Sequence, residues 1–468
     1  MEVGGGATLE ESWARTEMAG VEVWEQRCRG SLERICEQVL ARPEESFSAA
    51  CGPGLRQAGS RILGVPQMSV EKLLAGHVEQ TAQRCQAQAA VIVVQDTTDV
   101  NYTTHKGASG LGPINSHPDS RGLLLHTALA LTTEGVPLGL LSQESWAREP
   151  ATVGTAAHRR TRPVAEKERQ KWVTGWQRVA EAVPDGPGVG LVQDREADMF
   201  AFVAASRPAH VELIVRVCQP WRGEVDAGAV GGPRTVLEAA RQAPVLGPLR
   251  VQVPRQPGQP EREAVLELAA SAVVVKGPQR RSVDVPAGSR ALWVVRATES
   301  APPPGCQPIE GILLTTLAVD SLATARRGVQ YYALRWRVER FHYPRQQGCT
   351  VERLQFEGAH PLKNALALYS SVAWRLLWLT YTAREQPQAP ATELLPPLEL
   401  RVLAEATQTP VPTAREAIRA LAQLGGFPLN PSAQEPGVKV LWRGLRRLEA
   451  MVEGWLLALQ AGLFMRQD

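Results

Sequence analysis

The order of apolar and polar residues divides this chain of 468 residues into helical and strand-like stretches. From residue 1 to about residue 85, apolar side chains recur at helical spacing, as in VEVWEQRCRGSLERICEQVLA and SVEKLLAGHVEQTAQRC. The β-branched run at residues 88–97 (QAAVIVVQDT) has the continuous apolar character of a strand buried on both faces. The pattern therefore predicts a helical N-terminal region that leads into an α/β unit.

Strands and helices continue to alternate after this first strand. Two strand-like runs, RGLLLHTALAL and GVPLGLLSQ, are joined by TTEGVP, which has turn chemistry. The helix candidate VAEKERQKWVTGWQRVAEAV comes next, and the buried strand GVGLVQD then leads into the short helix candidate EADMFAFVAAS. The run AHVELIVRV completes this part of the predicted α/β unit.

The composition changes between about residues 219 and 308, where Pro and Gly become frequent. Short alternating segments such as LRVQVPRQ, EAVLELAASAVVVK and SRALWVVRATE predict an antiparallel β unit inserted into the α/β unit. The strand IEGILLTTL and the long helix candidate DSLATARRGVQYYALRWRVERFHY return to the earlier pattern. From about residue 361 onward the chain is predicted to be helical.

Composition narrows the class of protein only slightly. Hydrophobic residues make up 44% and charged residues 21%, which is typical of a globular protein, and the length predicts two to four domains. No apolar stretch reaches the roughly 18 residues of a membrane-spanning helix, and the N-terminus lacks a secretory signal pattern. We therefore expect a cytoplasmic protein without a membrane partner.

Cysteine usage and charge add two further constraints. The seven cysteines are scattered without a CxxC pair, which argues against a zinc ribbon or a disulfide framework and fits a reducing cytoplasm. The net charge of +3, from 51 Lys and Arg against 48 Asp and Glu, neither requires nor excludes nucleic acid. Arginine outnumbers lysine, which suits phosphate binding, but a GC-rich coding sequence explains the same bias.

Two aspartates follow buried strands and are candidates for metal binding. Asp96 comes after VIVVQ and Asp194 comes after GLVQ, so a rigid scaffold would fix the direction of each carboxylate. Two divalent cations that share oxygen ligands can activate an attacking hydroxyl and stabilise the leaving oxygen of a phosphodiester. The alternative is that each aspartate caps the turn or helix that follows its strand.

A third acidic residue, Glu339, lies in the long helix candidate. Tyr332, Arg335 and Glu339 are spaced so that they share one face of that helix. An arginine one turn before a metal-binding glutamate can hold a phosphate bidentately, and the tyrosine can donate to another phosphate oxygen. The alternative is an exposed helix with an ordinary Arg–Glu pair four residues apart.

The histidines offer weaker candidates, because the eight show no metal-ligand spacing. His126 lies in an apolar strand, so a core histidine with satisfied hydrogen bonds is the favoured interpretation. His342 follows Glu339 by three residues and would be able to approach the same site. The basic run KVLWRGLRRLEAM is a candidate for phosphate contacts, with a solvated helix face as the alternative.

An ordered set of strings resembles the insertion-sequence-4 family of bacterial transposases. The resemblance runs from about residue 20 to about residue 460. In the first part of the chain the strings are QDTTDVNYTTH, GLGPI, SRGLLLHTALAL, GVPLGLLSQ, EKERQKW, DREADMF and YYALRWRVERFH. In the last part they are GCTVERLQF, LALYSSVAWRLLWLTY, LGGF and EPGVKVLWRGLRRL.

The resemblance implies an α/β fold with a ribonuclease-H-like catalytic core, in which helices flank a mixed sheet. Residues 86–218 and 310–375 would form this core, and residues 219–309 would form an inserted antiparallel β subdomain. A helical N-terminal domain at residues 1–85 would bind the DNA ends. A helical C-terminal domain at residues 376–468 would pair two protomers.

The resemblance also implies a DDE transposase, a metal-dependent DNA endonuclease and strand transferase. Its carboxylate triad would be Asp96, Asp194 and Glu339, which would hold two Mg²⁺ or Mn²⁺ ions. Such an enzyme excises an insertion sequence at its terminal inverted repeats and joins it to target DNA, by phosphodiester hydrolysis and strand transfer. It acts as a homodimer on paired double-stranded ends in the bacterial nucleoid. It uses no nucleotide cofactor, and the sequence has no Walker-type glycine loop.

Further residues would contact DNA by the same resemblance. They are Tyr332, Arg335, Arg195, Arg216, Arg222, Arg345 and Gln346. Gln346 stands where the family's signature has a lysine, and Pro344 is expected to kink or end the helix just before it. Gly311 stands where the family has a tryptophan that stacks on a flipped base, and Trp293 is a candidate substitute.

These departures leave two main hypotheses. In the first, the chain is an active transposase with altered auxiliary residues. In the second, it is a decayed or repurposed copy that binds DNA or pairs with relatives without completing transposition. A structure-specific nuclease with the same core is a third alternative, which the extent of the resemblance disfavours.

Overall fold

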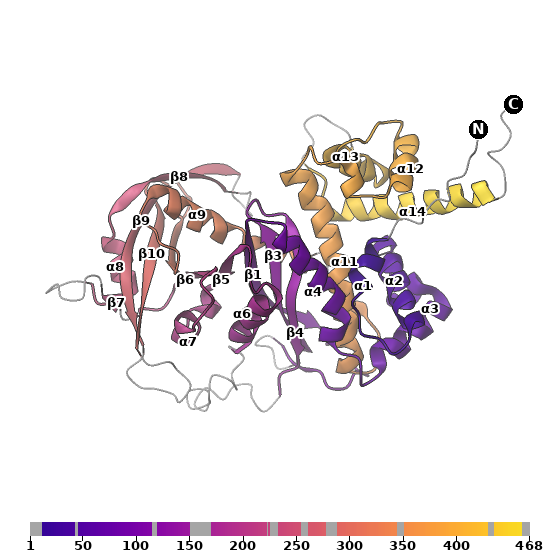
Figure 1. Ribbon diagram of the computed structural model, residues 1–468, viewed down its shortest axis with the longest axis horizontal. Helices are drawn as coiled ribbons and strands as arrows, with labels where there is room; N and C mark the ends of the chain where they lie inside the picture. The colour runs from indigo at the N-terminus through magenta and orange to yellow at the C-terminus, as the bar shows by residue number, and fades with distance from the viewer. Residues whose placement is uncertain are drawn as a thin grey trace.

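The computed structural model is a mixed α/β protein in which helices flank one large mixed sheet (Figure 1). The structure describes residues 12–42, 45–114, 119–149, 170–221, 223–224, 233–253, 261–277, 288–343, 351–428 and 435–460.

Four helices form the N-terminal region, as the helical spacing of apolar residues predicted. They are α1 (Trp13–Met18), α2 (Gln26–Ala41), α3 (Phe47–Gly64) and α4 (Val70–Gln86). Ser12, Ser46 and Ser69 cap α1, α3 and α4, because each hydroxyl accepts a hydrogen bond from a backbone N–H in the first turn. A buried ionic network ties α1 to α4: the Glu17 carboxylate bonds Nδ1 of His77 and, at 2.7 Å, Nη1 of Arg84.

Five strands at one side of the sheet hold the two candidate aspartates. In spatial order they are β4 (Pro137–Trp146), β3 (Arg121–Thr132), β1 (Ala90–Asn101), β5 (Gly188–Gln193) and β6 (Val211–Arg216). β4, β3 and β1 pair antiparallel, whereas β1, β5 and β6 pair parallel. Both faces of these strands are covered, so their sequences are almost continuously apolar.

The strands predicted between residues 219 and 309 are present and continue the same sheet. β11 (Glu310–Thr315) pairs antiparallel with β6 and also with β10 (Ser289–Glu299). β9 (Arg262–Lys276) pairs with β10, and β8 (Val245–Val253) pairs with β9. Two short strands, β2 (Gly112–Pro113) and β7 (Gly223–Glu224), lie at the edges. The stretch is therefore joined to the α/β unit by a hydrogen-bonded ladder.

Different helices cover the two faces of the sheet. On one face, α6 (Gln170–Ala182), α7 (Phe200–Ala204) and α8 (Val236–Gln242) share a hydrophobic core with odd-numbered residues of β1 such as Val91 and Val93. On the other face, α9 (Leu322–Ala333), α10 (Trp336–Tyr343) and α11 (Ala359–Glu385) pack on even-numbered residues such as Ile92 and Val94. Parity along β1 therefore decides which helices a side chain meets.

The long helix predicted through Tyr332 and Glu339 is in fact two helices, so that prediction is wrong. The backbone N–H of Leu334 donates to the carbonyl of Tyr331, and that of Arg335 donates to the carbonyl of Tyr332. These bonds span three residues instead of four, which tightens the chain into a turn between α9 and α10. Tyr332 belongs to α9 and Glu339 to α10, so they do not share one face of one helix.

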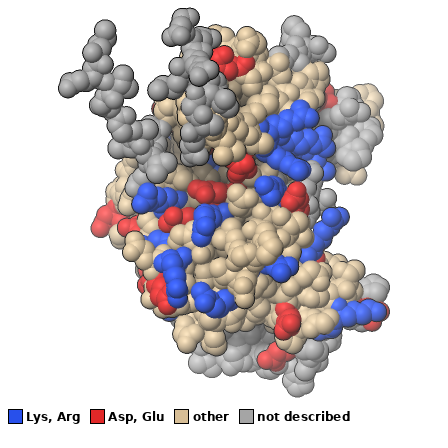
Figure 2. Space-filling view, turned by 90° about the vertical axis from the view of Figure 1, so that its right-hand side faces the viewer, with Lys and Arg blue, Asp and Glu red and all other residues tan. Residues whose placement is uncertain are grey.

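The described residues after 361 form mainly helices joined by short turns, as predicted. α12 (Pro397–Thr407), α13 (Ala414–Leu424) and α14 (Val438–Gln460) pack near α11, and α14 also packs against α2 (Figure 1). On the face that carries the N-terminal helices and α14, basic and acidic side chains are intermixed (Figure 2). None of the described helices is long and apolar enough to cross a membrane. The six described cysteines form no disulfide.

Two glycines of α14 provide a matched test of helix packing. A Cβ at Gly444 would lie 1.9 Å from the carbonyl oxygen of Leu421 in α13, whereas a Cβ at Gly454 would meet nothing within 4 Å. We expect Gly444→Ala to lower the free energy of unfolding by about 1–3 kcal/mol, because α13 and α14 must move apart. Gly454→Ala should raise it by about 0.5–1 kcal/mol, since alanine loses less backbone entropy in a helix. Urea denaturation of both variants would contradict this packing if the two changes had the same sign.

Candidate active site

The pairing of β1 with β5 places the two candidate aspartates side by side. The parallel register joins Ile92 to Gly190 and Val94 to Val192, an offset of 98 residues (190 − 92). Asp96 and Asp194 are separated by the same 98 residues (194 − 96). When the register is continued by two residues, the aspartates come to lie on neighbouring chains, and neighbouring strands are about 4.8 Å apart.

The position of Asp96 within its strand differs from the prediction. Asp194 does follow its strand, because β5 ends at Gln193. Asp96 instead lies inside β1, which continues to Asn101 and pairs Asp96 with Thr127 of β3. β1 extends further than β5 because β3 is long enough to pair with β1 up to Asn101. The antiparallel partner therefore holds the backbone on both sides of the Asp96 carboxylate.

Both aspartates face the same helices. Asp96 has the parity of Ile92 and Val94, and Asp194 has the parity of Val192, whose side chains lie in the core on the α9–α11 face. α10 packs against β1 and α11 on this face. Glu339, in the first turn of α10, is therefore carried by a helix that covers the strand of Asp96.

The capping alternative also applies to Asp194. Its Oδ1 atom accepts a hydrogen bond of 2.8 Å from the backbone N–H of Glu196, and this bond caps the short 3-10 helix Arg195–Ala197. A carboxylate has several acceptor positions, so one capping bond leaves the other oxygen able to bind elsewhere. The cap also fixes the rotation of the side chain.

Glu339 is engaged with Arg335 in an ion pair. Nη2 of Arg335 lies 2.8 Å from Oε1 of Glu339, four residues later. The alternative of an Arg–Glu pair is therefore observed, but the helix is not an exposed one, because Arg335 is only 9% exposed and Val338 and Phe341 are fully buried. The Nε atom of Arg335 is buried and has no hydrogen-bond partner among the described residues.

The electrostatics join these residues into one site. The pKa of the Asp96 carboxyl is raised to about 7, mainly by burial and also by the negative charges of Asp194 and Glu339. The Thr97 backbone N–H and Arg335 oppose this rise. For Arg335, burial lowers the pKa, but Tyr332, Glu339 and Asp96 outweigh it and the net shift is upward. The predicted triad, Arg335 and Tyr332 therefore act on one another.

The donor set suits a hard divalent cation, because it consists of carboxylates held in mutual repulsion. A carboxyl whose pKa is raised by burial, and further by two acidic neighbours, gains stability when a cation approaches. The described residues do not, however, contain three His, Cys, Asp or Glu side chains already gathered around one metal position. Glu339 bonds Arg335 instead.

The other predicted DNA contacts have different outcomes. Arg195 is exposed directly after Asp194. Arg216 lies at the end of β6, and its Nη2 atom donates a long hydrogen bond of 3.5 Å to the carbonyl of Glu310. Arg222, Pro344, Arg345 and Gln346 lie outside the described residues.

The two positions considered for base stacking lie on neighbouring strands. Gly311 in β11 pairs with Ala297 of β10, and a Cβ there would meet nothing within 4 Å. Trp293 pairs with Thr315, four residues along β11 from Gly311, and packs partly buried against the core. Trp293 therefore does not occupy the space beside Gly311.

Two histidines and one tryptophan lie in or near the candidate site. His126 is a core residue, as predicted: it bonds Thr97 at 2.9 Å and Gln95 at 3.3 Å, and its ring meets Trp172 edge-on. His342 is buried on α10. The sequence interpretation missed Trp336, which is 60% exposed with the Arg335 guanidinium 4.8 Å from its ring centre. Its signal was an aromatic residue between two arginines, RWR.

Asp198 is a second residue that the sequence interpretation missed. Its buried carboxylate accepts hydrogen bonds of 2.8 Å from the backbone N–H groups of Cys218 and Gln219, and it also bonds the indole N–H of Trp221. It therefore holds the chain after β6, next to predicted contact residues. The available signal was the second aspartate of the DREAD string.

The pKa of Asp96 gives a pH-dependent prediction for the metal-free chain. Because the folded-state pKa lies near 7 and the unfolded value near 4, the folded chain binds the extra proton between these pH values. Stability should therefore fall as pH rises from about 4 to about 7, by roughly 2–4 kcal/mol from this group. Asp96→Asn should remove that part of the fall. Urea titrations in the presence of a chelator would contradict the pKa if wild type and variant had parallel pH profiles.

Comparisons with known proteins leave the family of this chain open. No family model matches the chain. Among solved structures, the chain is similar to one described as the piggyBac transposase synaptic complex with hairpin DNA, determined by cryo-electron microscopy. The identity is 10% and the TM-score is 0.35, with 95% of this chain and 77% of that chain covered. A likeness this distant shows neither the family nor the activity of the chain.

Proposed function

We propose that this chain is a DDE-type transposase that cuts double-stranded DNA at terminal inverted repeats and joins the cut ends to target DNA. One observation carries the proposal. The parallel register of β1 and β5, continued by two residues, brings Asp96 beside Asp194, and Glu339 and Arg335 act on the Asp96 carboxyl. Three carboxylates and a buried arginine, brought together where α10 packs on β1, suit the handling of a phosphodiester.

The strand arrangement supports the ribonuclease-H-like core that the family resemblance implies. Three antiparallel strands, β4, β3 and β1, are followed in space by β5 and β6, which run parallel to β1. The strands of residues 219–309 fall between β6 and β11 in sequence, where the inserted β subdomain is expected. In the proposed enzyme, the helical N-terminal region binds DNA ends and the helical C-terminal region pairs two protomers.

Asp96, Asp194 and Glu339 would hold two Mg²⁺ or Mn²⁺ ions. Bound there, such ions supply an activated water or hydroxyl and stabilise charge on the leaving oxygen. Asp96 contributes a carboxyl whose pKa near 7 lets it give up its proton readily when a positive charge approaches. The hydrogen bond that Asp194 accepts from the backbone N–H of Glu196 fixes the rotation of the Asp194 side chain, which would favour metal binding.

Arg335 and Tyr332 would position the phosphate. The guanidinium of Arg335 is held in place by Glu339, and its buried Nε has no partner among the described residues, so donors remain for a phosphate oxygen. When Arg335 turns to a phosphate, Glu339 loses its ion pair and its carboxylate becomes free to bind elsewhere. DNA binding and completion of the carboxylate triad would thus be linked through one ion pair.

Gly311 favours the second candidate function, a decayed or repurposed copy that binds DNA without completing transposition. The space beside Gly311 is open, and Trp293 does not fill it. A base flipped out of the DNA duplex would meet no aromatic side chain at position 311. The loss of that surface impairs end processing without affecting the carboxylates.

We expect Asp96→Asn, Asp194→Asn and Glu339→Gln each to reduce divalent-ion-dependent cleavage of the DNA that flanks the coding sequence by about 10³-fold or more. Each change removes a negative charge with little change of shape. Glu267→Gln, on the exposed side of β9, is the matched control and should cleave like the wild type. Cleavage is measured on labelled duplex ends with Mg²⁺ or Mn²⁺. Wild-type activity in all three site variants would refute the triad.

A second experiment separates the two candidate functions. The double variant Gly311→Trp with Gln346→Lys restores the two family residues that handle DNA. If the chain is a decayed copy, wild type should bind the ends without cutting them, and the double variant should gain cleavage. If the chain is an active transposase, wild type should cut and the double variant should change the rate by less than about tenfold, or 1.4 kcal/mol. Silence of both proteins with intact end binding would exclude the active enzyme.

A further inference from the structure

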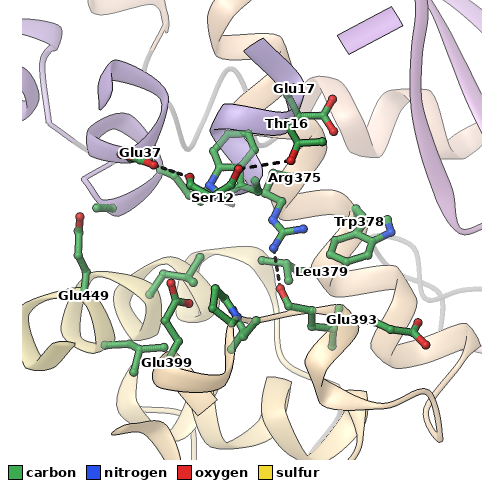
Figure 3. Close-up of a pocket in the computed structure, with 18 of the residues that line it drawn as sticks. Ser12, Thr16, Glu17, Glu37, Arg375, Trp378, Leu379, Glu393, Glu399 and Glu449 are labelled. Atoms are coloured by element: carbon green, nitrogen blue, oxygen red, sulfur yellow. Dashed lines mark hydrogen bonds between the residues drawn. The ribbon is translucent and has the colours of Figure 1, made fainter. Parts of the chain in front are cut away.

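A cavity of about 680 Å³ lies between the N-terminal and C-terminal helices (Figure 3). None of the residues that line it belongs to the candidate active site. α1, α2 and α4 contribute one side, α11 contributes the floor, and α12, α14 and the turn before α12 contribute the rest. This volume is within the range of small-molecule sites, which is about 300–1,000 Å³. It is therefore large enough for a ligand of several heavy atoms.

Carboxylates dominate the polar lining of this cavity. Six glutamates line it against two arginines: Glu17, Glu37, Glu393, Glu399, Glu449 and Glu453, with Arg84 and Arg375. Figure 3 shows that Glu37, Glu399 and Glu449 come from different helices and lie on the same side of the cavity. Three separate helices thus bring negative charge to one space.

Both arginines are already occupied. Arg84 pairs with Glu17 at 2.7 Å and lies over the ring of Trp374. Arg375 donates a hydrogen bond of 2.6 Å to the carbonyl of Leu394, and its guanidinium lies 4.5 Å from the ring centre of Trp378. Each positive charge is therefore held at the floor of the cavity, away from Glu449.

The carboxylates of Glu399 and Glu449 form no hydrogen bond or ion pair with any described residue. Burial raises the pKa of Glu399, against the nearby Arg375. Burial, and then the charge of Glu453, raises the pKa of Glu449 to about 7. Arg375 near Glu399 and Arg42 near Glu449 oppose these shifts without cancelling them. A positively charged ligand would therefore relieve both the burial and the repulsion of the two acids.

The surface between the carboxylates is apolar. Leu40, Leu445, Leu448 and Val452 line the same side as Glu37 and Glu449, and Pro396 and Pro397 lie beside Glu399. A bare metal ion gains nothing from such walls. A chain of methylene groups that carries ammonium groups matches both features, because the methylenes bury apolar area while the charges reach the glutamates.

We propose that this cavity binds a linear alkyl polyamine, with Glu399 and Glu449 as its main carboxylate partners. The ligand would lie between α2, α12 and α14 and would join helices from both ends of the chain. The same alkylammonium chemistry occurs in the lysine side chains of a protein partner. The free amine is the committed occupant, because the cavity has room for several methylene groups and carboxylates from three helices surround it.

The test measures binding of spermidine to the full-length, DNA-free chain by titration calorimetry at constant ionic strength. We expect a saturable spermidine site and a higher melting temperature. MgCl₂ at equal charge should give the same response in the wild type and in Glu399→Gln with Glu449→Gln, because Mg²⁺ would bind at the proposed carboxylate triad and not in this cavity. Glu399→Gln with Glu449→Gln should weaken binding by roughly tenfold or more, because two charge partners are lost. Glu405→Gln, an exposed position on α12, is the matched control and should bind like the wild type.

A second variant keeps the test decisive if the double variant folds poorly. Val452→Lys places an ammonium group in the cavity, so it should raise the melting temperature and abolish the response to spermidine. Heat that does not saturate with spermidine, a MgCl₂ response that the double variant loses, or unchanged spermidine affinity in the double variant would overturn the proposal. A lysine–glycine peptide of the same charge that binds more tightly than spermidine would overturn the choice of a free amine. None of these outcomes depends on DNA cleavage.

Discussion

The parallel pairing of β1 with β5 is the constraint on which the candidate site depends. Its offset of 98 residues equals the spacing of Asp96 and Asp194, so backbone hydrogen bonds bring two negative charges together. The same alternation buries Gln95 and Gln193 on the opposite face, where Gln95 lies against Gly175 of α6. A slip by one residue would exchange amides and carboxylates between the two faces, which burial of both faces prevents.

Much of this arrangement was predictable from the chain, for reasons that particular residues make clear. The uninterrupted VIVVQ and GLVQ runs predicted the two strands, and the acids that follow them supplied two of the three triad candidates. The third, Glu339, came from the helix candidate, and the family resemblance joined the three into a triad. The extension of β1 past Asp96 was not predictable, because it depends on the length of β3. The turn at Leu334 and Arg335 was not predictable either, because both residues favour helix and the break accompanies the packing of α10 on β1.

The cavity could not have been inferred from the sequence at all. Its walls come from segments separated by more than 400 residues, and each glutamate by itself looks like an ordinary solvated helix position. What the two regions share is a physical state: carboxyls with a pKa near 7, held together by surrounding structure. In each case folding moves carboxyl groups into a poorly hydrated space, which costs free energy. Binding of a cation would offset that cost and stabilise the folded state.

Helix α11 has a mechanical consequence for both regions. Trp374, Arg375 and Trp378 of this helix form the cavity floor. Further along the same helix, Tyr381 stacks under the guanidinium of Arg337, and Glu385 pairs with it at 2.6 Å. Arg337 belongs to α10, two residues before Glu339. A 27-residue helix is a stiff rod about 40 Å long, so a tilt imposed at its middle also displaces its end. Helix α11 therefore connects the glutamate-lined cavity mechanically to α10, the helix that carries Glu339.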